Sequence, residues 1–224
     1  MIPLRDVIPS RTTPVVTIGL IALNIIVFVY ELSLGRAVDA FMLYYGLVPA
    51  AFSWMNVITS MFLHGGWMHL IGNMWFLWIF GDNIEEHLGT VRFVIFYLVV
   101  GIAGALAQAF SLPSSTLPMI GASGAIAGVL GGYLMLFPRA KIVTFIPIPL
   151  LWPVIDVPAW VFLGLWFFGQ FFISSGSNVA WMAHVGGFLA GLGLIRLLAK
   201  TRPQSPTAAP DVEYLPPPRR NQSW

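Results

Sequence analysis

A serine surrounded by small residues is the first feature of this sequence that could carry chemistry. Ser123 lies in a Gly-Ala-Ser-Gly run within a long apolar stretch. Gly124, Gly128 and Gly132 then recur every four residues, so a helix that begins here presents bare backbone along one face. Such a face packs helices closely in lipid. A hydroxyl at the start of this face could act as a nucleophile if a base approached it.

A second small-residue face accompanies the only histidine in the second half of the chain. Ala183, Gly187 and Gly191 repeat the four-residue spacing beside His184. Small residues at this spacing more often serve helix packing alone, and a membrane serine commonly bonds a backbone carbonyl. An ionisable residue within a membrane segment, however, is costly and is functional by default. We therefore interpret Ser123 as a nucleophile and His184 as its general base.

Two further polar residues share one face of the helix predicted after residue 66. His69 and Asn73 are four residues apart, so their side chains point the same way. Together with the backbone amide near Ser123, they could donate hydrogen bonds to an oxyanion, although a structural hydrogen bond between helices is the alternative. His64 does not share their face, and we interpret it equally as a loop anchor or as an accessory donor.

A third, orienting carboxylate is missing from the predicted pair. No Asp or Glu occurs between Glu86 and Asp156, so the sequence predicts a Ser-His dyad rather than a triad. We expect packing against the glycine face of the serine helix to orient the imidazole. The chain has no cysteine, no His-Glu-x-x-His motif and no pair of membrane aspartates, so we predict neither a metal nor a cofactor.

The composition is that of an integral membrane protein. The 224 residues are 58% hydrophobic and 9% charged, and the mean hydropathy is +0.83, whereas a soluble globular domain has about 25% charged residues. The net charge of +2 is too small to indicate a nucleic-acid partner. The lipid bilayer is therefore the first partner that the sequence predicts.

Six apolar runs predict six membrane helices. They cover residues 14–32, 67–80, 92–110, 121–137, 159–173 and 179–200. A polar segment, residues 1–13, precedes the membrane domain of residues 14–200. A proline-rich tail, residues 201–224, follows it, and we expect this tail to be disordered.

The predicted connections differ in character. Residues 33–56 form a long amphipathic loop that we place in the membrane interface, where Tyr and Trp are favoured. Residues 85–87 form a polar connection after a helix that we expect to end at Gly81. Residues 138–158 form a proline-rich loop.

The positions of the basic residues predict the orientation. Of the eleven Lys and Arg residues, all except Arg36 lie in the N-terminal segment, at the second and fourth connections, or from the end of the sixth helix onwards. The positive-inside rule therefore places both termini in the cytoplasm. With this topology, the second, fourth and sixth helices begin at the outer side, and their first turns hold His69, Ser123 and His184. Three distant polar residues thus converge at one depth.

Three motifs, in their order along the chain, resemble those of the rhomboid family of intramembrane serine proteases. They are His69-x-x-x-Asn73, Gly121-Ala122-Ser123-Gly124, and His184 with Gly187 three residues on. The resemblance spans about residues 15–198. It implies an all-α, six-transmembrane-helix rhomboid-like bundle with Ser123 as nucleophile and His184 as base. It also implies that His69 and Asn73 stabilise the oxyanion, and that the substrates are transmembrane proteins cut near the outer face.

The chain departs from the family pattern at two positions. Many members have Trp-Arg where this chain has Trp54-Met55, and many have an aromatic residue where it has Ala127. We therefore expect different anchoring of the first loop and different packing around His184. We also expect a bacterial plasma membrane as the location.

Two other classes of protein compete with a protease. One is a small transporter or channel with His64, His69 and His184 along a proton or metal path, which predicts polar groups spread through the depth of the bundle. The other is an inactive relative that binds and escorts membrane proteins, which the presence of both Ser123 and His184 disfavours.

Overall fold

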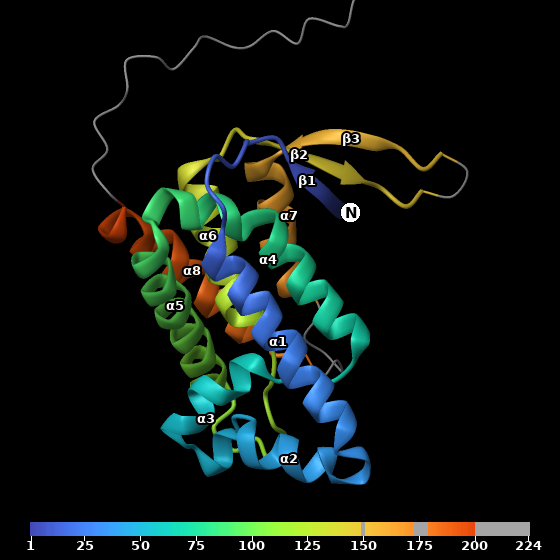
Figure 1. Cartoon of the computed structure of the whole chain (residues 1–224), viewed down its shortest axis with the longest axis vertical. Helices are drawn as coiled ribbons and strands as arrows, with labels where there is room; N and C mark the ends of the chain where they lie inside the picture. The colour runs from blue at the N-terminus through green and yellow to red at the C-terminus, as the bar shows by residue number, and fades with distance from the viewer. Residues whose placement is uncertain (149–150, 173–178, 200–224) are drawn as a thin grey trace, which may run out of the picture.

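The computed structural model describes residues 1–148, 151–172 and 179–199, and it shows a bundle of helices around one buried helix. The bundle consists of α1 (Val15–Ser33), α4 (Trp67–Leu88), α5 (Thr90–Ser111), α6 (Ser123–Leu136), α7 (Ala159–Gln170) and α8 (Trp181–Leu198). Helix α6 is buried continuously from Gly124 to Tyr133, and in Figure 1 it lies among the other helices. The predicted disordered tail, residues 201–224, lies outside the described residues.

The outer surface and the helix lengths are those of a helical membrane bundle. Among the described helices, α1, α5 and α8 are long and apolar enough to cross a membrane, and α6 and α7 are shorter apolar helices. Large apolar side chains such as Ile26, Phe110 and Phe168 are exposed. The 14 residues of α6 span about 21 Å at 1.5 Å per residue, less than the hydrocarbon thickness of about 30 Å. The crossing of all six helices stays a prediction.

Helix α4 runs through Leu88 instead of ending at Gly81, so the predicted polar connection at residues 85–87 was wrong. Glu85 is buried, and its carboxylate accepts hydrogen bonds from the backbone N–H of Val16 at 2.9 Å and of Thr17 at 2.8 Å. The Thr17 hydroxyl donates to the same carboxylate at 2.9 Å. The carboxylate thus satisfies orphan N–H groups at the start of α1, which offsets the cost of burying it.

A small sheet forms from two segments that we predicted as irregular. Strands β1 (Ile2–Asp6), β2 (Lys141–Phe145) and β3 (Val154–Pro158) pair antiparallel in the order β1-β2-β3. Residues 141–145 are mostly β-branched or aromatic, and burial alternates along β2, a pattern typical of a strand. Figure 1 shows the sheet beyond the end of α6.

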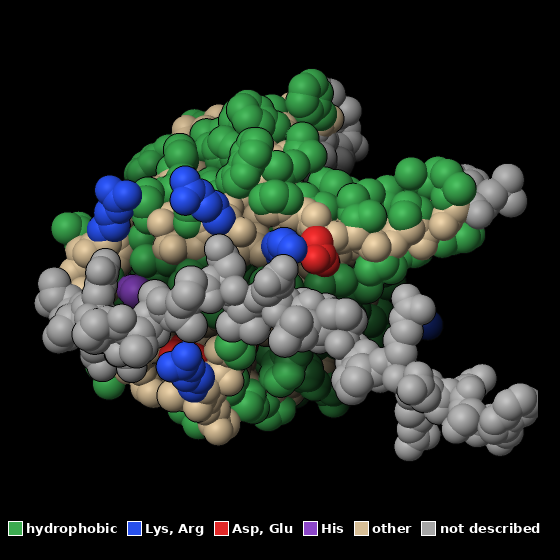
Figure 2. Space-filling view, turned by 90° about the horizontal axis from the view of Figure 1, so that it is seen from above, with side chains coloured by type: hydrophobic (Ala, Val, Ile, Leu, Met, Phe, Trp, Pro, Cys, Tyr) green, Lys and Arg blue, Asp and Glu red, His purple; other side chains and the backbone are tan. Residues whose placement is uncertain are grey.

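The sheet end of the bundle carries basic side chains. Arg5 lies in β1 and Lys141 in β2, and Arg92 in the first turn of α5 donates to the Leu198 carbonyl at the end of α8, at 3.1 Å. Figure 2, which views the molecule from this end, shows several Lys and Arg side chains on the face. This clustering agrees with the charge asymmetry from which we predicted the orientation.

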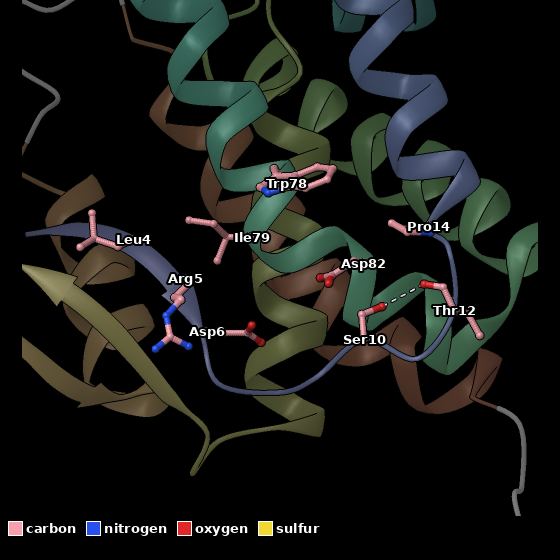
Figure 3. Close-up of a pocket in the computed structure, with 9 residues that line it drawn as sticks. All are labelled: Leu4, Arg5, Asp6, Ser10, Thr12, Pro14, Trp78, Ile79 and Asp82. Atoms are coloured by element: carbon pink, nitrogen blue, oxygen red, sulfur yellow. Dashed lines mark hydrogen bonds between the residues drawn. The ribbon is translucent and has the colours of Figure 1, made fainter. Parts of the chain in front are cut away.

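A pocket of about 300 Å³ lies at the same end, between the N-terminal segment and α4 (Figure 3). Its walls include Asp6 on β1 and Asp82 on α4. Asp6 accepts hydrogen bonds from the Tyr133 hydroxyl at 2.6 Å and from the Asn83 amide at 3.0 Å, which fastens β1 to α6 and α4. Burial raises the pKa of Asp6 above its ordinary value. Neither residue of the predicted dyad lines the pocket. Ser123 lies at the start of α6, whereas Tyr133, which bonds Asp6, lies near its end.

The segment between α1 and α4 folds into short helices, including α2 (Val38–Tyr45) and α3 (Trp54–Thr59). Its anchor is Asn56, whose buried amide donates to the carbonyl oxygens of Tyr44 at 3.0 Å and Gly46 at 2.8 Å. Met55 is 50% exposed, so the buried side chain of Asn56, rather than that of residue 55, anchors the loop.

Helices α6 and α8 meet through backbone because glycines line the contact. A Cβ atom added to Gly187 would collide with the carbonyl oxygen of Gly124, and one added to Gly191 would collide with that of Gly128. The four-residue spacing predicted this contact. The Cα of Gly128 itself, however, faces Val100 of α5, so a side chain at residue 128 would separate α6 from α5 rather than from α8.

We expect Gly187→Ala to lower the free energy of unfolding by about 1 to 3 kcal/mol, because a backbone carbonyl cannot move aside as a side chain can. Thermal unfolding of the purified protein in detergent measures this change. Gly193→Ala is the matched control on the same helix, since nothing lies within 4 Å of its added Cβ. A melting temperature of Gly187→Ala equal to that of the control would contradict the close backbone contact.

Candidate active site

Ser123 is placed by the sharp turn that begins α6. Gly121 has a φ of +119°, a left-handed conformation that favours glycine, and its N–H donates to the Ser60 carbonyl at 2.8 Å. Ala122 is the N-cap and Ser123 is the first helical residue. The serine therefore lies at a helix N-terminus, where free backbone N–H groups and the helix dipole favour negative charge.

His184 lies within hydrogen-bond distance of Ser123. Its Nε2 is 2.9 Å from the serine Oγ, and both residues are half-buried. The base comes from the first turn of α8, and this turn is tethered to α5 because the Gln108 side-chain oxygen accepts the Met182 N–H at 3.1 Å. A hydroxyl and an imidazole at this distance can exchange a proton.

The imidazole of His184 is held from its other side by α7. Its Nδ1 is 2.6 Å from the side-chain oxygen of Gln170, and the Trp166 ring lies against it with a centroid distance of 5.9 Å. We predicted that the glycine face of the serine helix orients the imidazole, and that prediction stays untested. The contacts that hold the ring here are an amide and an indole of α7, which the sequence did not predict.

His69 and Asn73 converge beside the turn that precedes Ser123. A Cβ added to Gly121 would lie 2.6 Å from His69 Nε2 and 3.7 Å from Asn73 Nδ2. The Gly65 N–H donates to His69 Nδ1 at 3.4 Å, so the neutral ring carries its proton on Nε2. The buried Asn73 Nδ2 has no hydrogen-bond partner among the described residues. His69 Nε2 and Asn73 Nδ2 thus both lie close to the Gly121 turn.

His64 lies behind His69 and is only 1% exposed. Its ring packs edge-on against that of His69, with centroids 5.1 Å apart. Its backbone N–H donates to the Glu31 carboxylate at 3.3 Å, so α1 holds the loop that leads into α4. Burial, and then the proximity of His69, lower the pKa of His64 to about 4. The ring is therefore neutral at neutral pH, and both of its buried nitrogens lack a hydrogen-bond partner among the described residues. The backbone of His64 anchors the loop, and the role of its ring as an accessory donor stays a prediction.

The structure thus brings the predicted residues together around Gly121 and the start of α6. Ser123, His184 and His69 come from the first turns of α6, α8 and α4, and Asn73 from the second turn of α4. Gly124 and Gly187 set the contact between α6 and α8. Gln170 and Glu31 were not predicted as part of the site. Gln170 is the lone amide at the end of the apolar helix α7, and Glu31 is the lone charged residue of α1; these were their only sequence signals.

The described residues contain no group of three His, Cys, Asp or Glu side chains that could hold a metal ion. The groups assembled here are a hydroxyl, a histidine pair and two amides. This set can accept a proton from a hydroxyl and donate hydrogen bonds to a developing negative charge.

Comparison with known proteins assigns the chain to a family. A model of the Rhomboid domain matches residues 51–201. RHOMBOID-like protein 6, mitochondrial, of Arabidopsis thaliana is 32% identical over 155 residues, which cover 67% of this chain and 45% of the relative. RHOMBOID-like protein 5 of the same plant is 31% identical over 166 residues, covering 72% and 48%. Rhomboid protease GluP of Bacillus subtilis is 42% identical over 81 residues, covering 36% and 15%.

The aligned part of the chain spans about half the length of the two plant relatives, at 45% and 48%. The family match and the apolar helices establish an integral membrane protein. The match covers more than half of the chain and includes the helices that carry the site. The protein belongs to the rhomboid family.

Proposed function

We propose that this protein is an intramembrane serine protease that hydrolyses peptide bonds in or near transmembrane segments of membrane proteins. Ser123 is the nucleophile and His184 is the general base. The observation that carries the proposal is the distance of 2.9 Å between Ser123 Oγ and His184 Nε2, at the N-terminus of a buried helix. Membership of the rhomboid family supports the same reaction class.

The reaction follows from the roles of the groups. Ser123 Oγ attacks the substrate carbonyl carbon while its proton passes to His184 Nε2, and the carbonyl oxygen becomes an oxyanion. His69 Nε2–H and Asn73 Nδ2–H stabilise that charge, with the backbone amide of Ser123. The imidazolium then protonates the leaving amine, and an acyl-enzyme forms. Water, deprotonated by the same imidazole, hydrolyses the ester and restores the serine.

The substrates are transmembrane proteins because of where the site lies. The apolar outer surface holds the bundle in lipid, and the site is at the end of the bundle opposite the basic, sheet-bearing end. If the basic end is cytoplasmic, the start of α1 and the end of α8 both face the cytoplasm. Cleavage then occurs towards the outer side of the membrane. A bacterial plasma membrane stays our proposal for the host membrane.

The test uses full-length protein in liposomes with a reporter that carries one transmembrane segment. Mass spectrometry of the products gives the cleaved bond, which we expect within or next to that segment. Suppose that purified wild type binds the reporters tightly but leaves every reporter of a varied panel intact. The protein would then be an inactive relative that binds and escorts membrane proteins, not a protease.

A further inference from the structure

We propose that Gln170 is a positioning residue that fixes the tautomer of His184, leaving Nε2 unprotonated towards Ser123. This inference rests on the proposed function, since an unprotonated Nε2 matters for catalysis only if Ser123 is the nucleophile. It adds a third member to the predicted dyad. That member is a neutral amide at the end of α7, where a catalytic triad of the familiar kind has a carboxylate.

The orientation of the Gln170 amide follows from its contact within α7. Its Nε2 donates to the Trp166 carbonyl at 2.9 Å, one turn earlier in the helix. A carbonyl oxygen only accepts hydrogen bonds, so the amide nitrogen must face it and Oε1 must face the other way. The other way is towards His184, whose Nδ1 is 2.6 Å from Oε1.

The amide orientation in turn decides the imidazole proton. Oε1 of Gln170 can only accept, so Nδ1 of His184 must carry the hydrogen. A neutral imidazole has one such hydrogen, so Nε2 presents a lone pair to the Ser123 hydroxyl at 2.9 Å. Gln170 is 4% exposed, and the opposite tautomer would set two lone pairs face to face in this buried contact. An unsatisfied buried pair of acceptors is strongly disfavoured.

The two histidines of the site are therefore held in opposite tautomers. His69 accepts the Gly65 N–H at Nδ1 and carries its proton on Nε2, which suits an oxyanion donor. His184 donates from Nδ1 to Gln170 and accepts at Nε2, which suits a general base. Each tautomer is set by the partner of the other ring nitrogen.

Nitrogen NMR of the full-length protein with ¹⁵N-labelled histidine rings tests this inference directly. The chain has four histidines, and the His184→Ala spectrum identifies the His184 signals by difference. In the wild type without substrate we expect a protonated Nδ1 and an unprotonated Nε2. Gln170→Met keeps the side-chain volume but removes the acceptor, and we expect it to shift the His184 proton towards Nε2.

The kinetic arm separates positioning from simple packing. We expect Gln170→Met to lower kcat by about 10- to 100-fold, the size of one buried hydrogen bond, with KM within about twofold of wild type. Gln170→Glu, assayed near pH 9 where the carboxylate is ionised, restores an acceptor and should recover much of the loss. Leu165→Met, a side chain 55% exposed on the same helix, is the control and should change neither tautomer nor rate.

Two results would overturn the inference. One is a wild-type His184 that carries its proton on Nε2. The other is a Gln170→Met protein whose tautomer and kcat equal those of wild type. The tautomer is read without substrate, so a protein that shows the expected tautomer but cleaves nothing would refute the proposed function and leave the assignment of Gln170 intact.

Discussion

Ser123→Ala and His184→Ala are each expected to reduce cleavage of a transmembrane reporter below detection while leaving a folded, membrane-inserted protein. The serine supplies the bond to the substrate, and the imidazole removes its proton at the 2.9 Å contact. In serine proteases, loss of either group costs on the order of 10⁶ in kcat. Product formation in liposomes and thermal unfolding in detergent, measured on the same preparations, give the two quantities.

The controls for this prediction use similar residues elsewhere in the chain. Ser33→Ala removes an exposed hydroxyl at the end of α1 that donates to the Tyr30 carbonyl at 2.6 Å, and it should keep full activity. The double variant Ser123→Ala/His184→Ala should be no less active than either single variant, because the two residues act as a unit. Full activity in either single variant would remove these residues from the mechanism.

His69→Ala and Asn73→Ala are expected to lower kcat by about 10² to 10³ each, with a smaller effect on KM. The reason is that the charge to which these donors bond exists only in the transition state. Their placement beside Gly121, with Asn73 Nδ2 left without a partner among the described residues, is that of donors held ready. If the two donors compensate for each other, each single substitution lowers kcat by less. The decrease in the double variant then exceeds the product of the two single decreases.

Steady-state kinetics with a reporter of graded concentration separates kcat from KM. Gly72→Ala is the matched control, since it lies between the two donors on α4 and nothing lies within 4 Å of its added Cβ. It should leave both parameters unchanged. Should both donor variants raise KM with kcat intact, the two side chains would be structural.

Much of the site could be predicted because its signals are local. The His69 and Asn73 spacing fixes a shared helix face, and the glycine repeats after Ser123 and around His184 indicate two helices that touch. We predicted that His69, Ser123 and His184 lie at one depth because successive membrane helices alternate in direction. These inferences need only the period of a helix and a count of spans.

The residues that escaped prediction act between elements that are distant in sequence. Gln170 reaches His184 from α7, and Glu31 reaches the backbone of His64 from α1. The end of α4 was mispredicted for the same reason. Glu85 looks like a polar loop residue in the sequence, because its hydrogen-bond partner Thr17 lies far away at the start of α1. No periodicity encodes which lone polar residues meet.

The strands show a different limit. Residues 141–145 carry strand-forming side chains, but a strand is stable only with partners, and those partners are β1 at the chain start and β3. The prolines and charged residues in residues 1–13 and 138–158 led us to predict irregular structure for both segments. Pairing across 136 to 143 residues, as between β1 and β2, is not visible in a local window.

Labelling with a fluorophosphonate tests the central claim most directly, because this reagent bonds only to a serine whose proton a neighbouring base removes. We predict a single phosphonylated residue, identified as Ser123 by peptide mass, in wild type and in Ser33→Ala. The label should be lost in Ser123→Ala and nearly lost in His184→Ala. Wild-type protein that takes up no label, or label at Ser123 that is undiminished in His184→Ala, would contradict a catalytic pair of Ser123 and His184.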